Sequence, residues 1–233
     1  MSSIKSKIFE HNSKHNFKFI DDEHKYLVNT EEYISVTTKL SKYFVFNKQK
    51  ISREVALRNW TTEDEVISDW DYRRDMGSYT HELANKYIEG ETMTQDELEV
   101  ITHIIDFLNE HKEFEIIASE LGIFSSKYKI AGTIDVILKE KSTGRYFTLD
   151  WKTSRKSIAK NEYFTMAREP FRHLPNSKLN MYSMQLWAYN LVLKEEYGIE
   201  IWDSFIVHLQ DSKKYIKIIP RDLRTEVEQF LLL

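Results

Sequence analysis

Two apolar runs in the middle of the chain each carry an aspartate where a strand favours an uncharged side chain. The first run, GTIDVILK, holds Asp135, and the second, YFTLDWK, holds Asp150 with Lys152 two places later. The sequence EKSTGR between them has the composition of a turn, so the two runs are expected to pair as a β-hairpin. Because side chains alternate along a strand, Asp150 and Lys152 should share one face, with Trp151 on the other.

Pairing of these strands would bring the two aspartates together at one end of the sheet. Two adjacent carboxylates repel unless a proton or a cation lies between them, and a hard divalent cation prefers oxygen ligands. Glu120, in the preceding apolar run IIASELGIF, is a third candidate; it is either a ligand, a group behind the ligands or an exposed edge residue. Lys152 beside such a metal suits positioning of a water or stabilisation of negative charge. The simpler alternative is that both aspartates are solvated at strand ends.

The composition limits the kinds of site that the protein can contain and the compartments in which it is expected. The chain has no cysteine, which excludes disulfides, thiolate zinc sites, cysteine-ligated iron–sulfur clusters and cysteine nucleophiles, and fits a reducing compartment. The N-terminal sequence lacks the apolar core of a signal peptide, and no run approaches the roughly 20 apolar residues of a membrane span. We therefore expect a soluble protein of the cytoplasm. The net charge of −4 gives no argument for a polyanionic partner.

One segment is basic in spite of the acidic total. From Lys152 to Lys178 there are two acidic residues and seven basic ones, a net charge of +5. Taken alone, such a segment is typical of a solvated face. Tyr163, Phe164 and Phe171 are interleaved with its cations, and that mixture suits phosphate contacts and base stacking along a nucleic-acid strand. The seven basic residues are Lys152, Arg155, Lys156, Lys160, Arg168, Arg172 and Lys178.

The periodicity of apolar residues predicts a mixed α/β protein in which a central mixed β-sheet is flanked by helices. The first forty residues are expected to form short β-elements, and 48–87 to be helical with an interruption near Met76 and Gly77. Thr94 and Glu97 have capping-box spacing at the start of a helix. No glycine-rich phosphate loop follows a strand, which argues against nucleotide binding of the Walker or Rossmann kind. Later strands are expected at 114–124, 128–139, 145–152, 199–209 and 214–220, and later helices at 177–197 and 221–233.

The aspartate after GTI and the D-x-K on the next strand resemble the active-site motif of the PD-(D/E)XK nuclease superfamily. Three further stretches are similar to its RecB-like and phage-exonuclease branch, which includes the mitochondrial genome maintenance exonuclease. MGSYTHELANKYIEG resembles the upstream helical motif, with His81 four residues after Gly77, and YSMQLWAYNLVL resembles Q-x-x-x-Y, with Gln185 and Tyr189. YISVTTKL resembles a short S-V-T element near the N-terminus.

The motifs occur in the expected order over about residues 34–220, with two departures from the family pattern. The proline of the superfamily's name is absent before Asp135, where Ala131, Gly132 and Thr133 stand instead. Asn85 occupies a position that is often glutamate, four residues after His81. The second departure concerns a secondary contact rather than the metal site.

The resemblance implies a restriction-endonuclease-like core with an N-terminal β/helical extension. It implies a single nuclease domain over 1–233, with an N-terminal β-hairpin and helical part in 1–112 and the catalytic core in 113–233. The implied catalytic residues are Asp135, Asp150, Lys152, Gln185 and Tyr189. The implied metal ligands are His81, Glu120, Asp135, Asp150 and the backbone carbonyl of Trp151. The residues expected to bind nucleic acid are Arg155, Lys156, Lys160, Arg168, Arg172 and Lys178.

The implied activity is that of a deoxyribonuclease with one or two Mg²⁺ or Mn²⁺ ions and no iron–sulfur cluster. It would be an exonuclease that processes single- or double-stranded DNA ends in replication, recombination or repair. The protein is expected in the cytoplasm of a bacterium or a phage-infected host. Its expected partners are DNA and a recombination or replication protein, and it is not expected to bind a membrane.

Two alternatives from other classes stay open at this stage. One is a non-catalytic DNA-binding or recombination accessory module with a nuclease fold, against which the intact Asp–Asp–Lys set argues. The other is a metal hydrolase of small phosphate esters, against which the basic, aromatic segment argues. For Gln185 and Tyr189 the simpler alternative is a hydrogen-bonded core amide and a packing residue.

Overall fold

The computed structural model describes residues 4–21, 23–155, 157–158, 165–210 and 214–233. The chain divides into two compact units, one of residues 1–44 and 103–233 and the other of residues 45–102. Among the described residues, no helix has both the length and the apolar character needed to cross a membrane.

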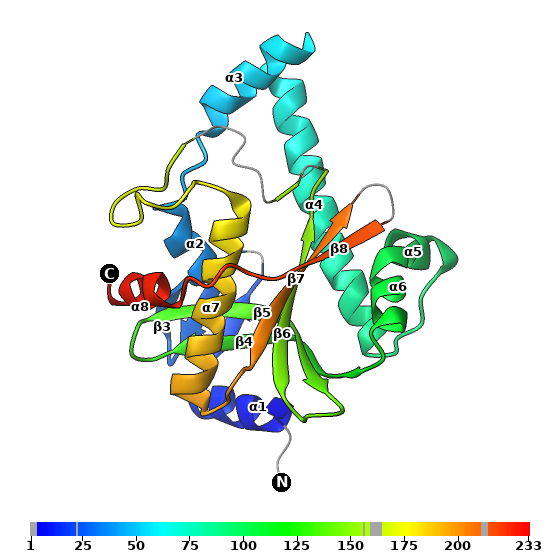
Figure 1. Cartoon of the computed structure of the whole chain (residues 1–233), viewed down its shortest axis with the longest axis vertical. Coiled ribbons are helices and arrows are strands. Elements are labelled where there is room, and N and C mark those ends of the chain that lie inside the picture. The colour runs from blue at the N-terminus through cyan, green and yellow to red at the C-terminus, as the bar shows by residue number, and fades with distance from the viewer. Residues whose placement is uncertain (1–3, 22, 156, 159–164, 211–213) are drawn as a thin grey trace. The chain divides into compact units, whose positions relative to one another are not determined.

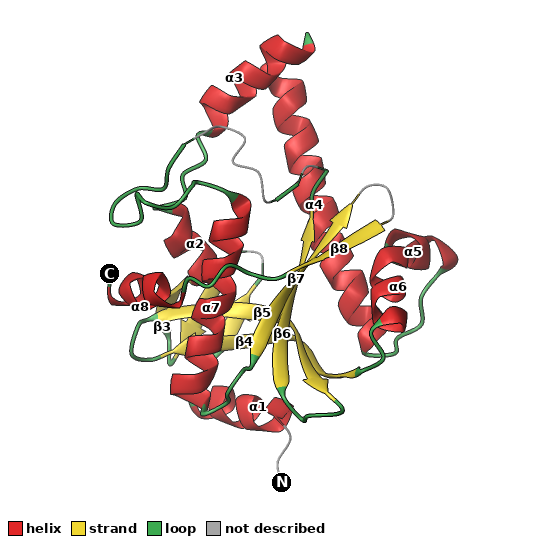
Figure 2. Ribbon diagram, viewed as in Figure 1, coloured by secondary structure: helices red, strands yellow, loops and turns green. Residues whose placement is uncertain are grey.

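The first unit is built on an eight-stranded mixed sheet with helices packed against it, which confirms the predicted fold class (Figures 1 and 2). Its strands are β1 (Lys18–Ile20), β2 (Lys25–Val28), β3 (Glu31–Ser35), β4 (Phe114–Ser125), β5 (Ile130–Glu140), β6 (Tyr146–Thr153), β7 (Asp203–Gln210) and β8 (Lys214–Ile218). Its helices are α1 (Ile4–Lys14), α2 (Val36–Ser41), α6 (Thr102–Glu110, apart from its first residue), α7 (Lys178–Tyr197) and α8 (Arg224–Leu232).

The sheet forks at β5. The strand order is β1-β2-β3-β5-β6-β7-β8, and β4 pairs with β5 in addition. β4 runs antiparallel along one edge of β5, so β3 and β6 must share the other edge. β3 pairs in parallel with Ile130 and Ala131, whereas β6 pairs antiparallel with 136–139. Within this described stretch, residues 132–135 therefore have no strand partner on that edge.

Helix α7 covers one face of the sheet and carries much of the core (Figure 1). Ser177 caps its start by accepting from the backbone N–H of Asn180, and Gly198 ends it in the left-handed region at φ 61°, where glycine is unstrained. Buried side chains occur around most of its circumference, because α7 packs against strands on one side and against α1, α2 and α8 elsewhere. On the opposite face of β6, Trp151 is buried against Phe107 of α6, with ring centroids 5.5 Å apart.

A buried polar network fixes α7 to two strands. The Thr148 hydroxyl of β6 donates to Asn190 Oδ1 at 2.9 Å, and Asn190 Nδ2 donates to Ser204 Oγ of β7 at 2.8 Å. The two hydroxyls lie 2.7 Å apart. Because all three side chains are buried, their polar atoms depend on one another rather than on water. This network sets the height of α7 over the strand that carries Asp150.

The second unit is helical, with α3 (Lys48–Asn59), α4 (Glu63–Ile88) and α5 (Gln95–Val100). Thr62 with Glu65 and Thr94 with Glu97 form capping boxes, the latter as predicted. The predicted interruption near Met76 and Gly77 is wrong, since α4 runs through both residues. The helical stretch is interrupted earlier in the sequence. Trp60 adopts φ 55° at the end of α3, and Thr62 caps the start of α4.

The expectation of short β-elements over the first forty residues is correct only in part. Residues 4–14 form α1, whose weak amphipathic pattern is that of a polar surface helix with Ile8 buried. The run YISVTT is split: its first half ends β3, and Ser35 then caps α2 by accepting from the backbone N–H of Thr38. The helix predicted from Thr94 onward is likewise divided between α5 and α6 at Ile101.

Replacing Asn190 with alanine is expected to lower the free energy of unfolding by about 1–3 kcal/mol, because Thr148 and Ser204 lose a buried partner. Asn109→Ala, at an exposed position of α6, is the matched control and should change it by less than about 0.5 kcal/mol. Urea unfolding followed by circular dichroism measures both. Equal effects at the two positions would contradict the role given to the network.

Candidate active site

The two aspartates lie at the mouth of the fork. Val136 and Leu149 form the first register pair of β5 and β6 after the fork, so Asp135 and Asp150 occupy the next opposed positions. The ladder does not continue there, and the backbone N–H of Trp151 instead donates to Asp135 Oδ2 at 2.8 Å. Both carboxylates are buried, with 8% and 2% of their surface exposed. The two buried carboxylates therefore lie opposite each other because β5 and β6 separate at this point.

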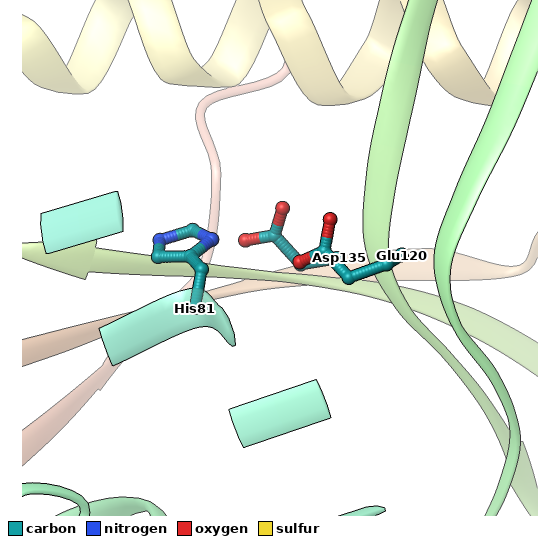
Figure 3. Close-up of side chains that lie close together, drawn as sticks. All are labelled: His81, Glu120 and Asp135. Carbon is teal, nitrogen blue, oxygen red and sulfur yellow. The ribbon is translucent and has the colours of Figure 1, made fainter. Parts of the chain in front are cut away.

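Glu120 approaches Asp135 from β4. The pairs Ser119–Val136 and Leu121–Ile134 place Glu120 opposite Asp135 in the register. Its φ of 45° lies in the left-handed region, an unfavourable conformation for a non-glycine residue inside a strand. A carboxylate oxygen of Glu120 and one of Asp135 lie within 4.8 Å of each other, and Figure 3 shows the two groups together.

Lys152 is held by Asp150. Its Nζ donates to Asp150 Oδ1 at 2.7 Å and lies 4.9 Å from the ring centroid of Tyr182 on α7. Burial lowers the pKa of Lys152, but the carboxylates of Asp150 and Asp135 outweigh it and raise the pKa above its usual value. Asp150 and Lys152 thus face α7 while Trp151 faces α6, as alternation along β6 leads one to expect.

Gln185 of α7 also binds the carboxylate of Asp150. Its Nε2 donates to Asp150 Oδ1 at 3.1 Å, so this oxygen accepts from both Lys152 and Gln185. Tyr189, one turn further along α7, is buried; burial raises the pKa of its phenol well above the usual value, and a hydrogen bond with Gln185 works in the opposite direction. Gln185 and Tyr189 therefore lie on the same face of α7.

Gly132 makes room for Tyr189. A Cβ atom at position 132 would lie 2.5 Å from Tyr189 Cε1 and 2.6 Å from its hydroxyl oxygen, closer than side chains tolerate. The glycine in the sequence GTID is thus required for close approach of the ring to β5, rather than for an unusual backbone angle.

The upstream motif lies in the second unit. His81 is on α4 and half-buried, with Gly77 and Asn85 one turn before and after it on the same helix. Figure 3 draws its imidazole with Glu120 and Asp135. His81 belongs to a different unit from the carboxylates.

The basic segment is described only in part. Among its described cations, Lys152 is half-buried and Arg155, Arg168, Arg172 and Lys178 are exposed. Lys156, Lys160, Tyr163 and Phe164 lie outside the described residues. Phe171 is fully buried and packs edge-on against Tyr43, with centroids 5.1 Å apart. The prediction that Phe171 stacks on bases is therefore wrong, since a residue that completes the core cannot also face a substrate.

Two residues near the site, Tyr182 and Tyr26, were not predicted from the sequence. Tyr182 lies one turn before Gln185 on α7, and helical periodicity could have identified it. Tyr26 of β2 lies with its hydroxyl oxygen 3.1 Å from Thr133 Oγ1, two residues before Asp135. No local pattern marks Tyr26, because its proximity arises from the pairing of β3 with β5, far apart in the chain.

The donor set suits a hard divalent cation. Two oxygens bound to one ion at 2.0–2.6 Å lie at most about 4–5 Å apart, which matches the spacing of the Glu120 and Asp135 oxygens. Carboxylate oxygens without thiolates fit Mg²⁺ or Mn²⁺ rather than a soft metal, and the chain has no cysteine to offer.

The mixed sheet, its fork and the acidic cluster define an α/β protein with a candidate metal site on its central strands. The model of the PD-(D/E)XK nuclease superfamily matches residues 49–230, more than half of the chain, and the protein belongs to that superfamily. Its members are nucleases that use divalent metals and act on DNA.

A solved structure titled "Crystal structure of SSO0001" is similar to the chain at 15% identity and a TM-score of 0.37, covering 98% of this chain and 83% of that one. No curated protein matches the chain.

Gly132→Ala is expected to lower the free energy of unfolding by about 1–3 kcal/mol, because the new methyl group forces Tyr189 out of its place. Tyr189→Leu removes the atoms with which the methyl group collides. In a double-mutant cycle measured by urea unfolding, the combined variant should therefore cost clearly less than the sum of the two single changes. Strict additivity would show that the two positions do not touch.

Proposed function

We propose that this nuclease is a Mg²⁺- or Mn²⁺-dependent deoxyribonuclease of the RecB-like and phage-exonuclease branch, which removes nucleotides from DNA ends. The observation that carries the proposal is the fork: Asp135 and Asp150 are opposed where β5 and β6 separate, and Lys152 Nζ lies 2.7 Å from Asp150. The branch rests on the ordered motifs around Ser35, His81 and Gln185, which resemble those of phage members and of the mitochondrial genome maintenance exonuclease.

The oxygen ligands are assigned to Glu120, Asp135, Asp150 and the backbone carbonyl of Trp151, with His81 completing the site for one or two ions. The short separation of Glu120 and Asp135 supports this assignment. When bound, such an ion supplies a water of lowered pKa and offsets negative charge on the phosphate. The left-handed backbone of Glu120 fits a ligand role, since strain of this kind gathers at functional sites.

The neighbouring side chains hold and orient the reacting groups. Lys152, fixed between Asp150 and the ring of Tyr182, presents an ammonium group that positions the attacking water and stabilises charge developing on the phosphate. Gln185 donates to Asp150 and thereby fixes the carboxylate that Lys152 also uses. Tyr189 supports Gln185 from the next turn of α7.

The DNA strand is proposed to leave the site along the basic segment. Arg155, Arg168, Arg172 and Lys178 are exposed there, and Lys156 and Lys160 of the same segment are assigned the same task. Arg172 lies 3.8 Å from Glu169, but both side chains are more than 70% exposed, so the pair is weak and leaves the guanidinium accessible to phosphate.

The wider role proposed is the processing of single- or double-stranded DNA ends in replication, recombination or repair. The setting would be the cytoplasm of a bacterium or a phage-infected host, with a recombination or replication protein as partner. The expected domain organisation is a single nuclease domain, with an N-terminal part in 1–112 and a catalytic core in 113–233.

Asp150→Asn and Lys152→Ala are expected to reduce metal-dependent cleavage of linear DNA by about 10²–10⁴-fold or more, because each removes a group aimed at the reacting phosphate or its water. His81→Ala should raise the concentration of Mn²⁺ needed for half-maximal cleavage. Release of nucleotides from end-labelled DNA in Mg²⁺, Mn²⁺ or EDTA measures all three.

Asp106→Asn and Lys112→Ala, both at exposed positions, are matched controls that should retain wild-type turnover. Binding of labelled DNA in EDTA should persist in the Asp150 and Lys152 variants. If both variants cleave DNA as fast as the wild-type protein, the catalytic assignment is wrong.

End dependence tests the exonuclease assignment. Linear single- and double-stranded DNA should be degraded, whereas covalently closed circles and linear DNA with blocked ends should persist under the same conditions. Gel analysis of the four substrates over time distinguishes the two modes. Cutting of closed circles would replace the exonuclease proposal with an endonuclease.

A further inference from the structure

The superfamily match begins at residue 49. The strands that precede this residue nevertheless reach the candidate site. β1, β2 and β3 form an antiparallel N-terminal hairpin sheet, and β3 joins β5 at Ile130 and Ala131. This pairing carries β2 alongside the fork. A segment outside the matched region therefore lies next to the stretch of β5 that presents Asp135.

Tyr26 is the residue of β2 that makes the contact. Its side chain is 4% exposed, and its hydroxyl oxygen lies 3.1 Å from Thr133 Oγ1. The phenol ring is fixed by Phe19 and Phe17, with centroids 4.7 and 6.0 Å away. Because rings packed in this way cannot swing freely, the hydroxyl has a defined position against β5.

The surroundings of this phenol are those of the metal site. Burial raises the pKa of Tyr26, a hydrogen bond with Thr133 works against this, and the carboxylates of Glu120 and Asp135 raise the pKa further. Tyr26 in turn raises the pKa of the Tyr189 phenol. Two neutral tyrosines, one from the N-terminal hairpin and one from α7, thus flank residues 132–135.

The fork explains why such contacts matter. Ladder hydrogen bonds normally hold both edges of a central strand, but residues 132–135 have β4 on one edge and no strand on the other within this described stretch. Two other hydrogen bonds reach this stretch: one between the hydroxyls of Tyr26 and Thr133, and one from the Trp151 N–H to Asp135 Oδ2.

We propose that Tyr26 is a positioning residue of the nuclease site: its hydroxyl fixes Thr133, and through it the direction in which β5 presents Asp135 to the metal. The inference rests on the function proposed above and adds the N-terminal hairpin to the working site. A ligand displaced by a fraction of an ångström weakens metal binding and slows the reaction, since catalysis depends steeply on position.

Tyr26→Phe removes only the hydroxyl. We expect the Mn²⁺ concentration for half-maximal cleavage to rise and turnover at saturating Mn²⁺ to fall, each by about 3- to 10-fold, the factor associated with one hydrogen bond of this kind. Tyr33→Phe is the matched control, because Tyr33 is the cross-strand partner of Tyr26, is equally buried, and has its hydroxyl 3.3 Å from Lys129 Nζ instead. It should leave the metal requirement unchanged.

Thr133 provides a second route to the same contact. Thr133→Val should reproduce the effect of Tyr26→Phe, Thr133→Ser should retain wild-type behaviour, and Tyr26→Phe with Thr133→Val should be no worse than either single change. Melting temperatures of all variants, measured without metal, show that the comparison is made on folded protein.

Binding of Mn²⁺ measured by calorimetry separates this inference from the proposed function. Weaker Mn²⁺ binding by Tyr26→Phe supports the inference even if the wild-type protein cleaves no DNA, a result that would count against the proposed function alone. A Tyr26→Phe protein with wild-type Mn²⁺ affinity and turnover overturns the inference, as does an equal loss in Tyr33→Phe. A wild-type protein that binds no Mn²⁺ overturns both.

Discussion

The separation of β3 and β6 from one edge of β5 is the constraint on which the candidate site depends. β4 covers the other edge of β5, and β6 stays paired with β7 over residues 147–153 while it leaves β5. A backbone donor that would otherwise enter the ladder, the N–H of Trp151, is satisfied by Asp135 instead. The fork thus opens the sheet where two carboxylates are needed, without leaving that donor unpaired.

Burial of so much charge demands partners from several elements. Asp150 accepts from Lys152 on its own strand and from Gln185 on α7, and isolated buried charges of this kind would be strongly destabilising. The Thr148–Asn190–Ser204 network holds α7 at the height at which Gln185 reaches Asp150. Gly132 then admits the ring of Tyr189 against β5. The fold and the site therefore share the same contacts.

Local sequence patterns were sufficient to predict much of this arrangement. The hairpin of β5 and β6, the long helix α7 and the faces of Asp150, Lys152 and Trp151 follow from periodicity and turn composition. The break at Trp60 and the helix over residues 4–14 were missed, because a left-handed residue and a polar helix leave weak signals. Phe171 and Tyr26 show a different limit: one is buried and the other reaches the site through contacts between segments distant in the sequence.

We propose that the fork holds a divalent metal between the strands that carry Asp135 and Asp150. The most direct measurement is an anomalous difference map from crystals grown with Mn²⁺, collected for the wild-type protein and for Asp135→Asn. We expect a peak at coordination distance, roughly 2.0–2.6 Å, from carboxylate oxygens at the fork, and a strongly reduced peak in the variant. Wild-type crystals that show no peak at the fork at millimolar Mn²⁺, or a peak that Asp135→Asn leaves unchanged, would contradict it.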